Sequence, residues 1–300
     1  MLKIYARAVL ILLTGIIGMS LAAQGIGGVL NENMIAYMAQ TGTITDLYLM
    51  DVERANSVNL TRTPVIYESH PTWSPDGRFL LFDRMDTIGQ QACVIAPFES
   101  WIPRCFELPD RYVEHAGWDE NPAVALIFRR DVFLYAAANA LTGEILEGYD
   151  TSNEWLSYSK DRRYRISFVT VDFVQQIQVQ DRVEDRSWRV FASEYFTTRP
   201  VISPDGMQIA FSAIAGTDTD IELYVIDTAE GSTPRQITFN DQRLDESPTW
   251  SPDGAWIAFL SDRDPGVRRE THLYMIRADG SDVRRLTYAP MNHFEPAWMP

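Results

Sequence analysis

Positively charged residues are scarce in this sequence of 300 residues. Lysine and arginine together number 26, against 41 aspartates and glutamates, and the formal net charge is -15. An acidic surface of this size repels a phosphate backbone. The composition therefore argues against nucleic acid as a partner, and it suits a protein that is soluble outside the cell or that binds a cationic partner.

Long hydrophobic runs are also missing, apart from one near the N-terminus. Lys3 and Arg7 precede an apolar run over residues 8–21, which is short for a membrane span and ends in small residues typical of a signal-peptide cleavage site. We predict that residues 1–23 are a cleaved signal peptide, with an uncleaved helical membrane anchor as the alternative. In both cases the remaining chain is exported: it is periplasmic, extracellular or anchored to a membrane and facing outward.

The sequence lacks a Gly-x-Ser-x-Gly segment and has only two cysteines. Without that segment there is no elbow of the kind that presents the nucleophilic serine of α/β-hydrolases. Cys93 and Cys105 lie symmetrically about Glu99, in two short apolar runs that predict a hairpin with the cysteines opposite each other. Export permits a disulfide between them; the alternative is two buried free thiols.

A repeated strand and turn dominates what the sequence does contain. A segment ending in Ser-Pro-Asp-Gly occurs at residues 71–77, 200–206 and 248–254, each time followed by a short β-rich run. Proline and glycine provide the backbone angles of a tight turn. Alternating strands such as residues 220–226 and 272–276 supply a third element.

The spacing of these units predicts a β-propeller. The turn serines Ser74, Ser203 and Ser251, with degenerate copies at Asp119 and Ser159, stand roughly 40–50 residues apart, which is the period of a four-stranded propeller blade. Four strands per unit leave no linker between units, so we predict one domain.

The two ends of the chain complete one blade. Residues 295–300 match the first strand of a unit, whereas the chain after the signal begins with a second strand at residues 34–38. We therefore predict an all-β, six-bladed β-propeller over residues 30–300, monomeric and closed by strands from both termini, preceded by the signal or anchor helix. The predicted blades are residues 33–62 with 294–300, 67–109, 113–148, 153–193, 197–240 and 244–289.

The motif resembles the WD40-like PD40 repeat of the TolB-like propeller family. The turn is preceded by Pro-x-Trp and followed by an apolar strand that ends in Ser-Asp-Arg at residues 261–263 or Asp-Arg at residues 83–84. The resemblance covers residues 30–300, although the third and fourth blades depart from the motif. It implies a propeller with a water-filled channel and binding faces built from loops, and it does not imply one activity.

Four tryptophans recur at one site of the repeat: Trp73, Trp118, Trp250 and Trp298. An aromatic platform for a ligand is one interpretation. Because the residues follow the repeat, we favour packing between adjacent blades.

Polar residues stand just ahead of each predicted innermost strand. The starts of the innermost strands ring one mouth of a propeller channel, so residues far apart in sequence should converge there, on loops held by a rigid scaffold. The alternative is a solvated polar rim without a specific ligand. The candidate binding residues are Glu68, His70, Glu114, His115, Glu154, Arg199, Asp245, Glu246, His293 and Glu295.

We expect this rim to bind a protein segment or an envelope component, without catalysis and without a cofactor. The alternative function is that of a metal-assisted, lyase-like carbohydrate-active enzyme. In that hypothesis His70, His115 and His293 would hold a divalent metal together with a carboxylate. Some TolB-like propellers of pectin degradation, which this sequence resembles, rely on channel histidines.

Overall fold

Antiparallel four-stranded sheets form around the repeated turns. The computed structural model describes residues 33–87, 89–106, 113–119, 121–129, 134–146, 155–172, 174–193, 200–214, 220–240, 243–264 and 270–300. The predicted signal or anchor segment, residues 1–23, lies outside these ranges. Residues 33–300 form one compact unit. None of the described residues lies in a helix with the length and hydropathy that a membrane crossing requires.

The described strands build six blades. Blade one consists of β24 (His293–Trp298), β1 (Met34–Thr41), β2 (Ile44–Asp51) and β3 (Asn56–Asn59). Blades two and three consist of β4 (Tyr67–Trp73), β5 (Leu80–Met85), β6 (Gln90–Ala96) and β7 (Ser100–Cys105), and of β8 (Val113–Trp118), β9 (Val124–Arg129), β10 (Leu134–Asn139) and β11 (Ile145–Leu146). Blades four and five consist of β12 (Trp155–Tyr158), β13 (Tyr164–Val171), β14 (Val174–Asp181) and β15 (Arg186–Ser193), and of β16 (Val201–Ile202), β17 (Gln208–Ile214), β18 (Ile221–Asp227) and β19 (Arg235–Gln236). Blade six consists of β20 (Asp245–Trp250), β21 (Trp256–Ser261), β22 (His272–Arg277) and β23 (Arg284–Arg285).

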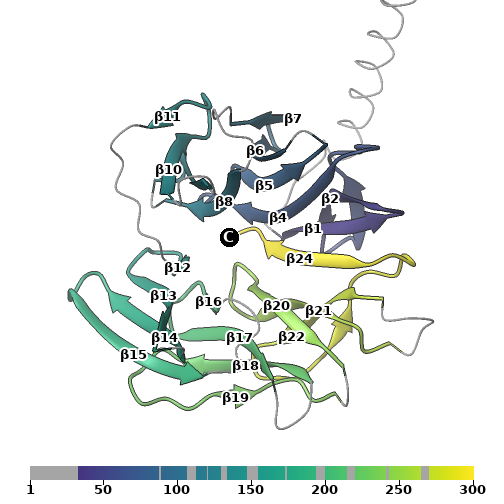
Figure 1. The fold of residues 1–300 in the computed structure, drawn as a ribbon. Helices are drawn as coiled ribbons and strands as arrows, with labels where there is room; N and C mark the ends of the chain where they lie inside the picture. The colour runs from purple at the N-terminus through teal and green to yellow at the C-terminus, as the bar shows by residue number, and fades with distance from the viewer. Residues whose placement is uncertain are drawn as a thin grey trace, which may run out of the picture. The chain divides into compact units, whose positions relative to one another are not determined.

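The first blade joins the two ends of the chain, as the sequence predicts. The C-terminal strand β24 pairs antiparallel with β1, with Trp298 opposite Ile35 and His293 opposite Ala39. Figure 1 shows these two strands side by side, yellow beside purple. The pairing covers the edge strands that an open ring would expose. The prediction of an all-β, six-bladed propeller closed by both termini is confirmed.

The repeated serine organises its own turn. The Ser74 hydroxyl donates to Asp76 Oδ1 at 2.7 Å and accepts from the Phe79 N–H at 2.9 Å. The same pair of bonds recurs around Ser203 and Ser251. These hydroxyls are buried and engaged in holding the turn, so their role is structural.

Adjacent blades pack through apolar side chains and through the repeated tryptophans. The indole Nε1 of Trp73 donates to the Ala297 carbonyl at 3.0 Å, and that of Trp118 donates to the Thr72 carbonyl at 2.9 Å. Trp250 makes the same bond to the Val201 carbonyl. Each indole is buried and fastens its blade to the inner strand of the preceding blade.

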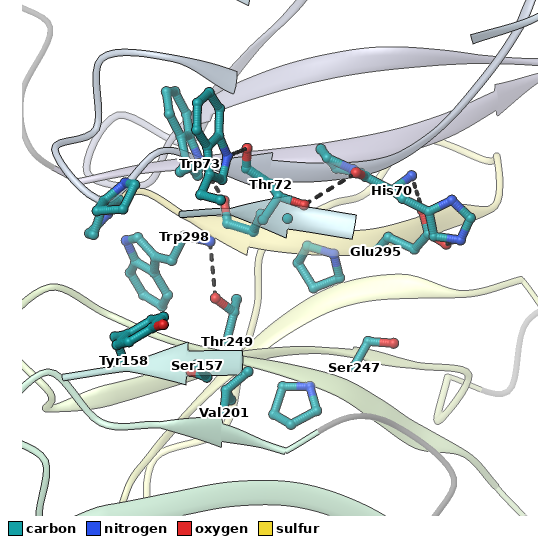
Figure 2. Close-up of a pocket in the computed structure, with 18 of the residues that line it drawn as sticks. His70, Thr72, Trp73, Ser157, Tyr158, Val201, Ser247, Thr249, Glu295 and Trp298 are labelled. Carbon is teal, nitrogen blue, oxygen red and sulfur yellow. Dashed lines mark hydrogen bonds and ion pairs between the residues drawn. The ribbon is translucent and has the colours of Figure 1, made fainter. Parts of the chain in front are cut away.

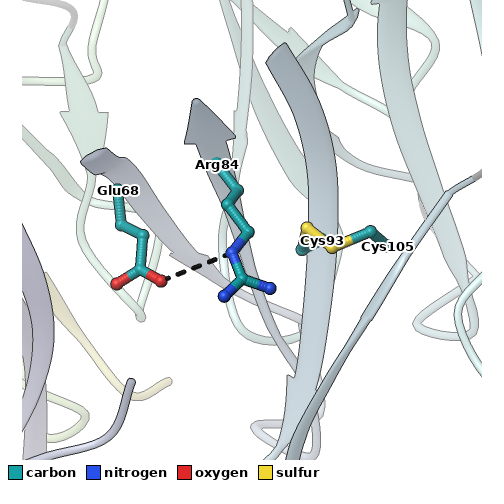
Figure 3. Close-up of a disulfide and its surroundings, with 4 residues drawn as sticks. All are labelled: Glu68, Arg84, Cys93 and Cys105. Atoms are coloured by element: carbon teal, nitrogen blue, oxygen red, sulfur yellow. Dashed lines mark ion pairs between the residues drawn. A yellow bond between two sulfur atoms is a disulfide. The ribbon is translucent and has the colours of Figure 1, made fainter. Parts of the chain in front are cut away.

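Strands β6 and β7 place Cys93 directly opposite Cys105. The two residues form a disulfide (Figure 3). It fastens the outermost strand of blade two to its neighbour.

Candidate binding site in the central channel

Four innermost strands carry the same kind of irregularity, among them β8, whose pairing with β9 shifts between His115 and Gly117. The register of β4 against β5 shifts between Ser69 and Thr72, and that of β20 against β21 shifts between Glu246 and Thr249. The pairing of β24 with β1 shifts at the matching place. A β-bulge of this kind re-aims a side chain, and bulges often lie beside functional sites.

In β4, β20 and β24 the bulged residue adopts a left-handed backbone conformation. The φ angles are 54° at His70, 57° at Ser247 and 49° at Glu295, and each residue precedes a proline. Positive φ is uncommon for residues other than glycine, and such residues cluster at binding and active sites. The three positions come from blades two, six and one.

These three residues line one cavity at the centre of the blades. Its volume is about 620 Å³, and its wall also includes Tyr158 and Trp298. Figure 2 shows His70, Ser247 and Glu295 entering from separate strands. His70 and Glu295, which the sequence predicts to converge, therefore line the same cavity, and Ser247 lines it with them.

His70 bridges two blades through two carboxylates. Its Nδ1 lies 3.2 Å from Oδ2 of the buried Asp83, and its Nε2 lies 3.1 Å from Oε1 of Glu295. Glu295 also accepts a hydrogen bond from the His70 backbone N–H. The imidazole is thus held in place while 57% of the side chain stays exposed. This arrangement presents a fixed, polar surface to the channel.

A smaller cavity of about 180 Å³ adjoins this region and gathers three glutamates, Glu68, Glu246 and Glu295. Burial raises the pKa of Glu246, and the neighbouring carboxylates of Asp262 and Glu295 raise it further. Crowded acidic groups with raised pKa values are typical of sites that accept a proton or a cation. The prediction that acidic residues of different blades converge at the inner strands matches this arrangement.

Three of the predicted rim residues are buried between blades instead of facing the channel: Glu68, Asp245 and His293. Each stands two residues before the bulged position of its strand, and their exposed fractions are 0%, 0% and 1%. Asp245 binds Arg263 Nη2 at 2.7 Å. On a regular strand, residues two apart point to the same face, so the sequence places these residues with His70, Ser247 and Glu295. The bulge at those three positions re-aims the side chain and separates the two sets.

Glu68 lies with its carboxylate 3.8 Å from Arg84 Nε (Figure 3). Its Oε2 accepts the Leu47 N–H, at 3.3 Å. Burial raises the pKa of Glu68 to about 7, which the Thr61 hydroxyl and Arg84 only partly counteract. Glu68 therefore reaches the small cavity from within the blade interface.

His293 is part of the closure between blades one and six. Its ring lies 5.2 Å from the His272 ring and 5.6 Å from the Tyr37 ring, and its Nδ1 lies 3.0 Å from the Thr271 carbonyl. Burial lowers its pKa to about 4. A neutral, packed imidazole in this position does not face a ligand in the channel.

The remaining predicted residues are placed only in part. Glu114 and His115 lie in β8, at the positions that Ser69 and His70 have in β4. The pairing of β8 with β9 shifts just after His115, and that of β4 with β5 shifts just after Ser69. Nothing is described of their side chains. Glu154 and Arg199 lie outside the described residues. Within the described ranges, no three His, Cys, Asp or Glu side chains are arranged as a metal-binding group.

Sequence reasoning missed the other wall of the channel. Tyr158, Lys160 and Arg162, around the turn of blade four, line the same cavity. The available clue was that Lys160 and Arg162 replace the Pro and Gly of the repeated Ser-Pro-Asp-Gly turn. Their positive charge stands out in an acidic protein.

A closed ring of four-stranded blades around a lined channel defines a six-bladed β-propeller. In agreement with the sequence resemblance, the family model described as the TolB beta propeller domain matches residues 155–300.

Individual relatives match shorter stretches. The chain is 32% identical over 108 residues to the uncharacterized peptidase YuxL of Bacillus subtilis (strain 168), covering 34% of this chain and 16% of that protein. It is 42% identical over 69 residues to the Tol-Pal system protein TolB of Anaeromyxobacter dehalogenans (strain 2CP-C), covering 23% of this chain and 15% of that protein. The alignments thus span about a sixth of the length of these curated relatives.

Among solved structures, TolB from Acinetobacter baumannii superimposes with a TM-score of 0.69 at 17% identity, over 93% of this chain and 70% of that chain. A likeness at this level of identity shows the fold alone.

Proposed function

We propose that this protein is an exported, non-catalytic scaffold that binds a segment of a protein or of another envelope component at the mouth of its channel. The observation that carries the proposal is the convergence of His70, Ser247 and Glu295 on one cavity, from three blades, each at a strained bulge. A rigid ring that holds polar groups of distant strands in one place provides a preorganised binding surface.

The chemistry of the cavity favours binding over catalysis. The hydroxyls of the repeated serines form hydrogen bonds within their own turns, at Ser74, Ser203 and Ser251. His70 is held between the carboxylates of Asp83 and Glu295. The lyase-like alternative needs His293 as a channel ligand, and His293 is packed beside His272.

Site-specific photo-crosslinking tests the proposal in the full chain expressed in its own envelope. A photoreactive amino acid in place of Ser247 is expected to capture a discrete partner. The matched control is the same amino acid in place of Val183, which is 70% exposed in the outer turn between β14 and β15. Glu295→Gln should weaken capture from Ser247. Equal capture from both positions, or none from Ser247, would contradict the proposal.

A further inference from the structure

The inner turn of blade four has the geometry of the repeated turn but not its residues. The Ser159 hydroxyl donates to Asp161 Oδ1 at 2.7 Å and accepts the Tyr164 N–H at 2.9 Å, and the Arg162 N–H donates to the Ser159 carbonyl at 2.9 Å. The Ser74 turn has the same three bonds. The turn is therefore formed as well by Ser-Lys-Asp-Arg as by Ser-Pro-Asp-Gly.

Arg162 occupies a position that favours glycine. Its φ is 62°, where Gly77, Gly206 and Gly254 have φ angles of 70°, 75° and 69° in the other three turns. A side chain at this φ costs free energy that glycine does not. Because the turn forms without an arginine in three other blades, the turn itself does not explain why Arg162 is there.

Lys160 and Arg162 both line the central cavity. Lys160 is one of two lysines in the sequence. The Arg162 guanidinium lies over the Tyr158 ring, 4.6 Å from its centre, which orients it. Asp161, the carboxylate of the same turn, is held by the Ser159 hydroxyl and the Arg163 N–H. The wall of the cavity is thus cationic at this place.

The acidic part of the cavity lies at a different level of the channel. Lys160 of blade four is equivalent to Pro75 in the turn of blade two, and Glu295 of blade one is equivalent to His70 at the bulge of blade two. These two levels are five residues apart along an inner strand, or roughly 16 Å at the rise of an extended chain. The cavity therefore has a cationic end and an anionic end.

We propose that the channel binds an extended peptide of about six residues, with a carboxylate held by Lys160 and Arg162 and a cationic side chain near Glu295. This inference rests on the proposed function and specifies its ligand. An arginine and a lysine side by side form charge-assisted hydrogen bonds with a carboxylate. A uniformly acidic oligosaccharide fits less well, because its other carboxylates would meet Glu295 and Glu246, in a protein with a net charge of -15.

The test compares the full chain with the double variant Lys160→Met, Arg162→Gly. Methionine keeps the backbone N–H that Lys160 donates to the Pro204 carbonyl at 2.8 Å, which proline would remove. Glycine restores the residue of the other three turns. The variant should therefore unfold at the same temperature as the wild type or higher, so a loss of binding would not reflect misfolding.

The probe is an array of synthetic hexapeptides with neutral interiors, whose end residues combine aspartate, asparagine, lysine and glutamine. We expect the wild type to prefer peptides with aspartate at one end and lysine at the other. The double variant should bind these at least tenfold more weakly and should not distinguish aspartate from asparagine. Glu295→Gln should instead remove the preference for lysine over glutamine.

Equal binding of the mixed-charge peptides by wild type and double variant would overturn the inference, as would preferential binding of an oligogalacturonate added to the same assay. Absence of any hexapeptide binding to the wild type would also overturn it. The cross-linking from Ser247 decides the proposed function separately, since a partner captured there without dependence on Lys160 and Arg162 leaves that function standing.

Discussion

Two buried groups at equivalent positions of the repeat should make stability respond to pH in opposite directions. Glu68 in β4 and His293 in β24 each stand two residues before a bulge and are almost fully buried. Removal from water raises the pKa of Glu68 from its ordinary 4.5 to about 7 and lowers that of His293 from 6.5 to about 4. In both cases burial disfavours the charged form.

The sign of each effect follows from which state binds more protons. Between pH 4 and 6.5, His293 binds a proton in the unfolded chain but not in the native one, so its contribution to stability rises with pH. Between pH 4.5 and 7, Glu68 binds a proton in the native state but not in the unfolded one, so its contribution falls with pH. Each window corresponds to about 3 kcal/mol, and in the wild type the two contributions offset each other.

Single variants separate the two contributions. In Glu68→Gln, the free energy of unfolding should fall by about 3 kcal/mol between pH 7 and pH 4, relative to the change in the wild type. In His293→Gln, it should rise by about 3 kcal/mol over the same interval. Glutamine preserves an acceptor for the Leu47 N–H in the first case and a donor for the Thr271 carbonyl in the second.

Urea unfolding followed by tryptophan fluorescence at several pH values measures these differences. Other carboxylates contribute the same background to every variant. The double variant Glu68→Gln, His293→Gln is the matched control. It removes both titrating groups, so its profile should follow the wild type, in which the two contributions offset each other. Parallel pH profiles for all four proteins would refute the reasoning, since they would mean that neither buried group changes its proton affinity on folding.

Three further predictions concern stability and are tested by the same unfolding measurements. Replacing Cys93 and Cys105 together by alanine removes a cross-link between residues 12 apart in sequence and should lower the free energy of unfolding by about 3 kcal/mol; an unchanged value would mean that the bond does not form in solution. Trp118→Phe removes the indole bond to the Thr72 carbonyl and should cost about 1 kcal/mol, whereas no loss would contradict its fastening role. Arg162→Gly should raise the free energy of unfolding by about 1 kcal/mol, because glycine tolerates the φ of 62°; a decrease would show that Arg162 stabilises the fold.

Much of the fold was predictable because the residues that each structural feature requires recur in several blades. The turn needs a serine, an aspartate and a residue that tolerates positive φ, and the interface needs an indole, so Ser74 and Trp73 recur with a blade period. Even the closure followed from the sequence, since the segment ending in Trp298 repeats the first strand of a blade for which the N-terminal segment supplies the other three.

The site was predictable only in part, because side-chain direction depends on single-residue details of the strands. Counting back from the turn correctly identified His70 and Glu295 as neighbours of one cavity. It did not separate them from Glu68 and His293, two residues earlier, because the pleat and the bulge together decide which residues face the channel. The pairing of His293 with His272 comes from different parts of the chain and left no local pattern.

The departures from the repeat carry more information about binding than the repeat itself. A requirement of the fold acts on every blade alike, so it produces recurrence, as at Ser74 and Ser203. The strained bulge recurs too, but the residue placed there changes from His70 to Ser247 to Glu295, and so does the residue at the left-handed turn position, from glycine to Arg162. Where the backbone conformation is the same in different blades but the residue differs, the stability of the fold does not determine which residue stands there. In both sets the varied residues line the central cavity, which is why the channel is where a ligand is expected.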